Sequence, residues 1–335
     1  MKADLLKRLF KGIFSEDIVS LKKIAHAIIS EKRKLGHEKL ANSLEHISVT
    51  EKPRYNTSSD RHINENGNKS ITAFSSLPTS KRDNVQLASF VPRELLKHHM
   101  ILPSDVEKRL QSIENEYAAR ERLSKYNLSP KRKILLHGSP GCGKTLSAER
   151  IAWNLGLPLL KVRFDALLSS YFGESASNLR AVFEYCKKEP VVLLLDECDF
   201  IAKSRMIAQQ DVGEVPRIVN MLLTLLDEYN ASGLVIATTN LKLTLDEALF
   251  RRFDDVIEIP MPQIEERERL LSMTLSAIPI DKSLDLSSLA EHMEGYSYAN
   301  IVLTAQRAAK YSVLEGNKNV DATHFEQAIA EGSKF

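Results

Sequence analysis

The chain has 335 residues, of which 43% are hydrophobic and 27% are charged. This composition is ordinary for a globular chain of about two domains, and it excludes a mostly disordered, collagen-like or disulfide-stapled protein. The three cysteines show no C-x-x-C spacing, so we expect neither a disulfide framework nor a zinc site, and we expect a reducing, cytoplasmic location. No apolar run approaches the roughly 18 residues of a membrane span, so we expect no membrane association.

The net charge of +2 hides an asymmetry along the chain. Residues 1–89 carry 16 Lys and Arg against 10 Asp and Glu, whereas the rest of the chain carries 30 against 34. A basic front segment either binds an acidic partner or is simply the solvated face of helices. We favour the solvated face, and we therefore do not expect nucleic acid to be the partner.

Two segments precede the main body of the chain. Residues 1–48 place apolar side chains at three- to four-residue spacing with a break at Gly36, which predicts a small bundle of amphipathic helices. So short a bundle is marginal alone, so we expect it to dock a substrate, a partner or another copy. Residues 49–89 are polar and lack a period, which predicts a flexible linker.

Residues 90–262 alternate short apolar runs with helical stretches, which predicts an α/β domain with a parallel sheet covered by helices. Residues 263–335 show helical patterns only, which predicts a separate all-helical subdomain. The expected strands are Ile134–His137, Leu159–Arg163, Val191–Asp196, Leu234–Thr239 and Val256–Ile259. The expected helices are Leu146–Leu155, Ser177–Lys188, Glu265–Ile278, Leu286–His292, Tyr298–Leu314 and Asp321–Glu331.

A phosphate-binding loop is the strongest signal in the sequence. The run matches G-x-x-x-x-G-K-[ST], with an expected strand before it and an expected helix after it. Such a loop curls backbone N–H groups around phosphate oxygens at a helix N-terminus. Lys144 can reach the β- and γ-phosphates, and the Thr145 hydroxyl can ligate Mg²⁺. The loop comprises Gly138, Ser139, Pro140, Gly141, Cys142, Gly143, Lys144 and Thr145.

Two adjacent carboxylates follow an apolar strand about 50 residues after the loop. The carboxyl end of a parallel strand points into the nucleotide crevice, so we expect Asp196 to hold the magnesium ion. Glu197 is the candidate general base that activates the attacking water. Asp199 either belongs to the same cluster or caps the next helix.

Two further motifs lie beyond the carboxylates. Asn240 ends another apolar strand, where its amide can hold the attacking water, although an Asn at a turn is common. Arg251 and Arg252 precede the last expected strand. A guanidinium there can stabilise charge on a transferring phosphoryl group, or it can be one half of a surface ion pair.

Taken in order, these motifs resemble those of the AAA ATPase family, and "ATTN" and "LFRRFDDVIEIPMP" are similar to its second region of homology. The resemblance covers about residues 95–335 and implies hydrolysis of ATP with Mg²⁺. It also implies hexameric rings, a sheet of order 5-1-4-3-2, and Arg251 and Arg252 acting on the neighbouring subunit's nucleotide. Leu146 and Ala299 are implied to contact the nucleotide.

An aromatic loop precedes the helix expected at Ser177. Tyr171, Phe172 and Gly173 resemble the family's pore loop, which grips an extended polypeptide in the central channel. Tyr and Phe offer large contact area without demanding a particular sequence, and a neighbouring glycine permits movement. The alternative is an aromatic pair packed in the core.

The sequence departs from the family pattern after Gly295, where Tyr298 replaces a small residue and Asn300 replaces an acid. These changes put one contact near the adenine or the subunit interface in doubt, but not hydrolysis. The arginine region is similar to that of severing ATPases such as katanin and spastin. "GYSYANI" and "DVGEVPRIVNMLL" more faintly resemble small bacterial AAA ATPases encoded beside subtilisin-like serine proteases.

Three functions are therefore compared. The first is an ATP-driven ring that unfolds or translocates a protein substrate through its pore, working beside a separate protease. The second is a slowly hydrolysing regulator whose assembled ring switches a partner protein on. The third is a DNA-remodelling ATPase, which only the basic N-terminal region supports.

Overall fold

The computed structural model describes residues 33, 77–80, 85–168, 174–199, 214–240, 250–316 and 319–332. The chain forms two units, Met1–Lys69 and Ser70–Phe335. The predicted N-terminal bundle lies outside the described residues except for Arg33, which is helical. Within the ranges given above, no helix has both the length and the apolar character that a bilayer span requires.

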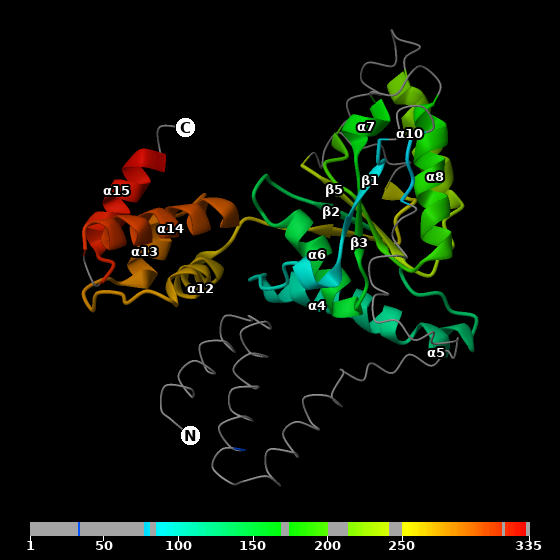
Figure 1. The fold of residues 1–335 in the computed structure, drawn as a ribbon. Coiled ribbons are helices and arrows are strands. Elements are labelled where there is room, and N and C mark those ends of the chain that lie inside the picture. Colours follow the sequence, from blue (N-terminus) through cyan, green and yellow to red (C-terminus); the bar gives the residue numbers. More distant parts are fainter. Residues whose placement is uncertain are drawn as a thin grey trace. The chain divides into compact units, whose positions relative to one another are not determined.

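A six-stranded sheet organises the second unit (Figure 1), in the order β1-β3-β4-β5-β2-β6. The five strands β2 to β6 run parallel, and their order is the one that the family resemblance implies. Each predicted strand is confirmed to within a residue or two. The strands are β1 (Ala88–Val91), β2 (Lys133–His137), β3 (Leu159–Val162), β4 (Val192–Leu195), β5 (Leu234–Thr239) and β6 (Asp255–Glu258).

The edge strand β1 corrects the predicted linker, which was expected to extend through residue 89. β1 pairs antiparallel with β3, and Leu87 and Ala88 are fully buried. The Leu87 carbonyl accepts the N–H of Arg163, and the Leu87 N–H donates to the carbonyl of Pro78. A few apolar residues in a polar run give too little periodicity to predict a strand, so this one is fixed by its tertiary pairing.

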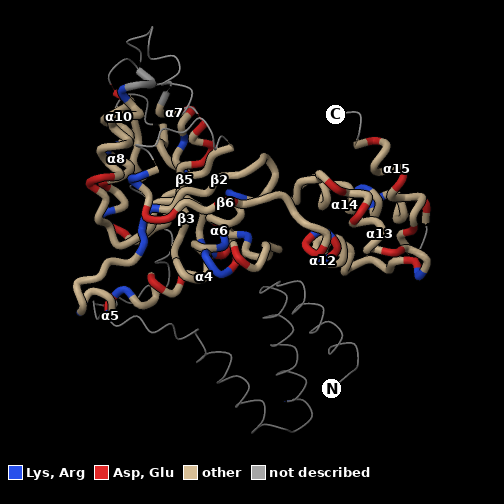
Figure 2. The backbone as a smooth tube through the Cα atoms, turned by 180° about the vertical axis from the view of Figure 1, so that it is seen from behind, with Lys and Arg blue, Asp and Glu red and all other residues tan. Residues whose placement is uncertain are grey.

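Side chains alternate between the two faces of the sheet, as the period of two requires. Ile134 and Leu136 of β2 lie in one hydrophobic cluster with residues of α4 and α6, whereas Leu135 lies in another with residues of α8 and α10. β4 and β5 carry no charged residue, while both signs of charge lie on the helices (Figure 2). The helices of this part are η2 (Arg93–Leu95), α4 (Ser104–Ala118), α5 (Arg120–Ser124), α6 (Lys144–Leu155), α7 (Phe164–Leu168), α8 (Ser175–Lys188) and α10 (Glu214–Asp227).

The last part of the chain is helical, as predicted. Three of its helices have a side-chain cap at the N-terminus. Gln263 and Glu266 form a capping box, and Asp285 and Ser297 each accept a backbone N–H. The buried Arg267 donates to the carbonyls of Pro262 and Ala290 and thereby joins the entry of the first helix to the second. The helices are α12 (Ile264–Leu275), α13 (Leu286–His292), α14 (Tyr298–Leu314) and α15 (Ala322–Gly332).

Candidate functional site

The phosphate loop follows β2 directly and leads into α6, as the motif requires. Gly138 has φ +148, and a Cβ on this residue would lie 2.2 Å from the carbonyl oxygen of Ile259. Gly143, at φ +89, caps the start of α6. Neither position accepts a side chain without strain. The loop therefore has the close-packed backbone that wraps an anion at a helix N-terminus.

Lys144 is folded onto the loop that precedes it. Its Nζ donates to the carbonyls of Gly138 and Ser139, each at 2.9 Å. Burial lowers the pKa of Lys144, and the carboxylates of Asp199 and Asp196 act against that shift. An ammonium held by two neutral carbonyls still carries an uncompensated charge, so the loop presents a cation where the motif places the phosphates.

The N-terminus of α14 touches the phosphate loop. The Ala299 N–H donates to the Gly141 carbonyl at 3.1 Å. Gly141 has φ +75, and a Cβ there would lie 2.6 Å from Oγ of Ser297, which also accepts the N–H of Asn300 at 3.3 Å. Ser297, which lies beside the two positions at which the sequence departs from the family pattern, thus caps α14 against the loop. Ala299 therefore lies beside the loop, and its contact with the nucleotide stays a prediction.

Asp196 follows β4 and is the centre of the polar cluster. Its Oδ1 accepts the hydroxyl protons of Thr145 at 2.8 Å and Thr238 at 2.7 Å. Its Oδ2 pairs with Nζ of Lys161 at 2.6 Å. Burial by itself raises the pKa of Asp196, but the hydrogen bonds from Lys161, Thr238 and Thr145 outweigh it and hold the pKa below its usual value. Asp196 is therefore an ionised carboxylate at neutral pH.

This donor set fits a magnesium ion. The Thr145 hydroxyl gives its proton to Asp196, which leaves the oxygen's lone pairs available to a cation. Hydroxyl and carboxylate oxygens are the ligands that Mg²⁺ prefers, with phosphate oxygens and water completing its shell. The ammonium of Lys161 on Oδ2 shows that the carboxylate already attracts positive charge. Thr145 and Asp196 could hold Mg²⁺ beside the phosphate loop.

Glu197 lies in a turn that Thr238 stabilises. Glu197 has φ +55, a left-handed conformation that is costly for a residue with a side chain. Its N–H donates to Oγ1 of Thr238 at 2.9 Å, and the N–H of Cys198 donates to the Thr238 carbonyl at 2.8 Å. The turn leaves the Glu197 side chain exposed next to Asp196. An exposed carboxylate at this position can reach a water molecule.

Asp199 is bonded to the end of β5, beside the polar cluster. Its Oδ1 accepts the Asn240 N–H at 2.9 Å and the Thr239 hydroxyl at 2.7 Å, and its Oδ2 accepts Nδ2 of Asn240 at 3.0 Å. Burial raises the pKa of Asp199, and these bonds together lower it below the usual value. Because its Nδ2 is held in this way, the Asn240 amide is fixed in one orientation at the end of β5.

The two arginines lie at the amino end of the parallel strands, whereas the phosphate loop lies at their carboxyl end. β6 runs parallel to β2, with Asp255 beside Ile134, so residues that precede β6 lie near the start of β2. Arg252 pairs with Asp227 at 2.9 Å, and Arg251 is exposed. The structure therefore brings Thr145, Asp196, Glu197 and Asn240 together, but it does not bring the arginines to their own chain's loop.

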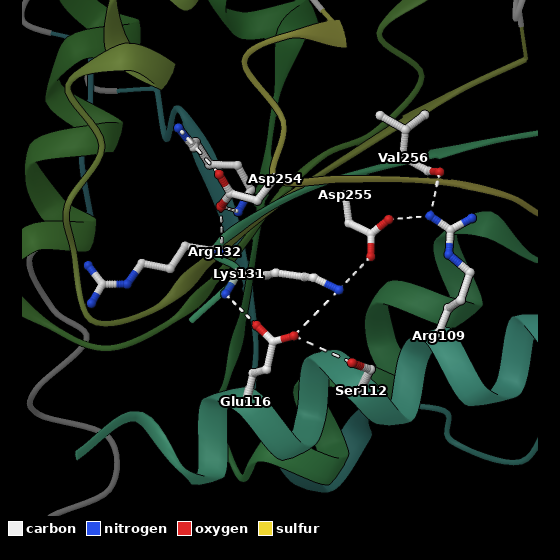
Figure 3. Close-up of polar contacts among 9 residues, drawn as sticks. Arg109, Ser112, Glu116, Lys131, Arg132, Asp254, Asp255 and Val256 are labelled. Carbon is white, nitrogen blue, oxygen red and sulfur yellow. Dashed lines mark hydrogen bonds and ion pairs between the residues drawn. The ribbon is translucent and has the colours of Figure 1, made fainter. Parts of the chain in front are cut away.

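A charged network fixes the segment after the arginines (Figure 3). Asp254 accepts the backbone N–H groups of Arg132 and Lys133 at 2.8 and 2.9 Å. Asp255 pairs with Arg109 of α4 and, at 3.0 Å, with Lys131. Burial raises the pKa of Asp255, but the bonds from Lys131 and Arg109 outweigh it and lower the pKa. The start of β6, and with it the arginine segment, is thereby anchored to α4 and β2.

The sequence did not predict the roles of two residues of the site, Thr238 and Lys161. The role of Thr238 leaves no signal beyond its place in the Thr-Thr-Asn run. Lys161 does leave one, because a charged residue interrupts the apolar run of a buried strand. The predicted pore loop, Tyr171, Phe172 and Gly173, lies outside the described residues.

Comparison with known proteins points to one family. A family model described as "ATPase family associated with various cellular activities (AAA)" matches residues 134–261. The chain is also 30% identical over 333 residues to an uncharacterized AAA family ATPase, y4kL, of Sinorhizobium fredii (strain NBRC 101917 / NGR234). That match covers 99% of this chain and 96% of the relative. The family match includes the phosphate loop, the carboxylate cluster and the arginines.

Proposed function

The chain belongs to the AAA ATPase family, and we propose that it hydrolyses ATP with Mg²⁺ at the site around Thr145 and Asp196. The convergence of Thr145, Thr238 and Lys161 on one ionised carboxylate beside a phosphate loop carries this proposal. Members of this family hydrolyse ATP in general. The residue roles below are our assignment for this chain.

Each group has one task in the proposed reaction. The loop amides and Lys144 bind the phosphates, and Thr145 and Asp196 hold Mg²⁺. When bound, Mg²⁺ neutralises charge on the β- and γ-phosphate oxygens. Glu197 takes a proton from the attacking water. Asn240, oriented by Asp199, fixes that water for in-line attack.

We propose that the working enzyme is an oligomer whose sites are completed by neighbouring protomers. Arg251 and Arg252 precede Asp254, whose N–H donates to the Lys133 carbonyl at the start of β2. The run of β2 from Lys133 to Gly138, at about 3.3 Å per residue, therefore places the arginines about 17 Å or more from their own phosphate loop, well beyond the reach of an arginine side chain. A head-to-tail ring offers these arginines to the next protomer's nucleotide. The family resemblance implies a hexamer.

We further propose that hydrolysis moves a polypeptide. The support is the sequence of Tyr171, Phe172 and Gly173, together with their place between α7 and α8. Residues 1–48 are proposed to recruit the substrate or a separate serine protease, because they lie outside the ATPase region and resemble its protease-paired relatives in their basic helical pattern.

The test compares wild type, Glu197→Gln and Tyr171→Ala in ATPase assays across protein concentrations, with and without an unfolded polypeptide. Glu197→Gln should abolish turnover but keep ATP bound. Wild-type activity should rise cooperatively with concentration and with polypeptide. Tyr171→Ala should lose only the stimulation by polypeptide. A slow rate that is indifferent to polypeptide and to Tyr171 would favour the nucleotide-gated regulator.

A further inference from the structure

Lys161 is the one charged residue of β3 and the one residue of this strand that is not buried. β3 reads Leu-Leu-Lys-Val, and its other three residues are buried. The period of two places Lys161 on the same face as Leu159, the face that α6 covers. This is also the face from which Thr145, at the start of α6, reaches Asp196.

The Lys161 ammonium lies directly on the carboxylate proposed to hold magnesium. Its Nζ is 2.6 Å from Oδ2 of Asp196, and the two side chains are 43% and 9% exposed, respectively. Thr145 and Thr238 already occupy Oδ1. Both carboxylate oxygens of Asp196 thus already have partners, and Lys161 on Oδ2 balances the negative charge that a divalent cation would also bind. Lys161 and Mg²⁺ compete for one group.

A cavity beside Asp196 can accept the Lys161 side chain when it is displaced. A cavity of ≈ 280 Å³ adjoins the pair, and Ser89, Arg163, Asp165 and Glu197 are among its lining residues. Asp165 is already paired with Arg163 at 2.8 Å, so Glu197 is the acidic neighbour that a displaced ammonium keeps within the same cavity. A four-carbon stem allows such a swing without movement of the backbone.

We propose that Lys161 is the resident counter-cation of Asp196 in the nucleotide-free protein and that magnesium must displace it when ATP binds. Lys161 thereby sets the Mg²⁺ concentration at which the enzyme loads. It is a positioning residue that acts through Asp196. This inference rests on the proposed ATP site, and it assigns regulation by magnesium to a residue outside every motif of that site.

Neutralising Lys161 should affect the binding of ATP with Mg²⁺ and the binding of metal-free ATP differently. Without the ammonium, Asp196 is free to meet the metal, so less Mg²⁺ is needed. Metal-free ATP, which carries more negative charge, loses one attractive cation and should bind no better or more weakly. A lysine with a merely structural role would weaken both forms together when it is removed.

The experiment uses the full chain and a fluorescent ATP analogue, titrated in EDTA and at rising Mg²⁺. In Lys161→Gln, whose amide can still donate to Asp196, half-saturating Mg²⁺ should fall by roughly two- to fivefold, the range expected for loss of a partly exposed ion pair. Lys161→Arg, which keeps the charge, should resemble wild type. Lys131→Gln is the matched control, because it removes an ion pair with Asp255 at the far end of β2 and should leave the requirement unchanged.

A second readout needs no nucleotide. Mg²⁺ alone should raise the melting temperature of Lys161→Gln more than that of wild type, since only the variant leaves Asp196 without a cation. An unchanged or higher Mg²⁺ requirement in Lys161→Gln would overturn the inference, as would a Lys161→Arg protein that resembles Lys161→Gln. Failure of the proposed function looks different, because wild type itself would then not bind the analogue with Mg²⁺.

Discussion

Thr238 joins the end of β5 to the turn that carries Asp196 and Glu197, so its hydroxyl should matter for both stability and turnover. In Thr238→Val the side chain keeps its shape and strand preference but loses two hydrogen bonds, one to Asp196 at 2.7 Å and one from the Glu197 N–H at 2.9 Å. Thr238 is 1% exposed, so water cannot replace them. At about 1–2 kcal/mol for each bond, with the charged acceptor at the upper end, the free energy of unfolding should fall by about 2–4 kcal/mol.

Urea denaturation followed by the fluorescence of Trp153, the single tryptophan, measures this loss. The Trp153 ring stacks on His98 with 3.8 Å between centroids, so unfolding of the α/β part changes its surroundings. Thr224→Val is the matched control, because Thr224 is exposed and bonds a carbonyl of its own helix, and it should cost less than about 0.5 kcal/mol. If Thr238→Val is as stable as Thr224→Val, the hydroxyl does not hold the Asp196–Glu197 turn.

Three other substitutions test separate contacts. Gly141→Ala places a Cβ against Ser297 at a positive φ and should raise the MgATP concentration for half-saturation about tenfold; unchanged binding would refute the contact between α14 and the loop. Asp199→Ala frees the Asn240 amide and should lower kcat at least about tenfold with little effect on nucleotide binding; an equal loss of binding would contradict a role in positioning water. Asp255→Asn should cost about 1 kcal/mol at pH 7, after discount for its partly exposed partners. Because the folded pKa of Asp255 is lowered, that cost should be full above about pH 4 and should disappear only as the pH falls through the lower folded pKa in acid-unfolding curves.

Most of the α/β architecture was predictable because local pattern and tertiary environment agree there. The apolar runs that became β2, β4 and β5 are buried, and α6 begins where the phosphate-loop motif places it. The strand order was available only through the family resemblance, since periodicity says nothing about which strands pair. β1 could not be predicted, because its pairing with β3 is a long-range contact.

The residues of the site likewise fall into those that a local motif predicts and those that only the fold brings together. Glycines, a lysine and adjacent carboxylates at fixed spacing leave a readable motif, so the residues around Thr145 and Asp196 were found. Asp199 was ambiguous because an acid near a helix start fits either a cap or a cluster. Lys161 lies on another strand, and only the register of β3 with β4 brings it beside Asp196. A local run of residues does not predict such contacts between strands.

The central claim is that one protomer's arginines complete the next protomer's ATP site. Two variants, each inactive by itself, test it most directly: Lys144→Ala, which keeps the arginines, and the double variant Arg251→Ala with Arg252→Ala, which keeps the loop. Mixed in equal amounts, they should regain about a quarter of the wild-type ATPase rate, because a quarter of the head-to-tail interfaces in a randomly mixed ring pair an intact loop with intact arginines. A mixture as inactive as its components, or a fully active arginine variant, would contradict the account.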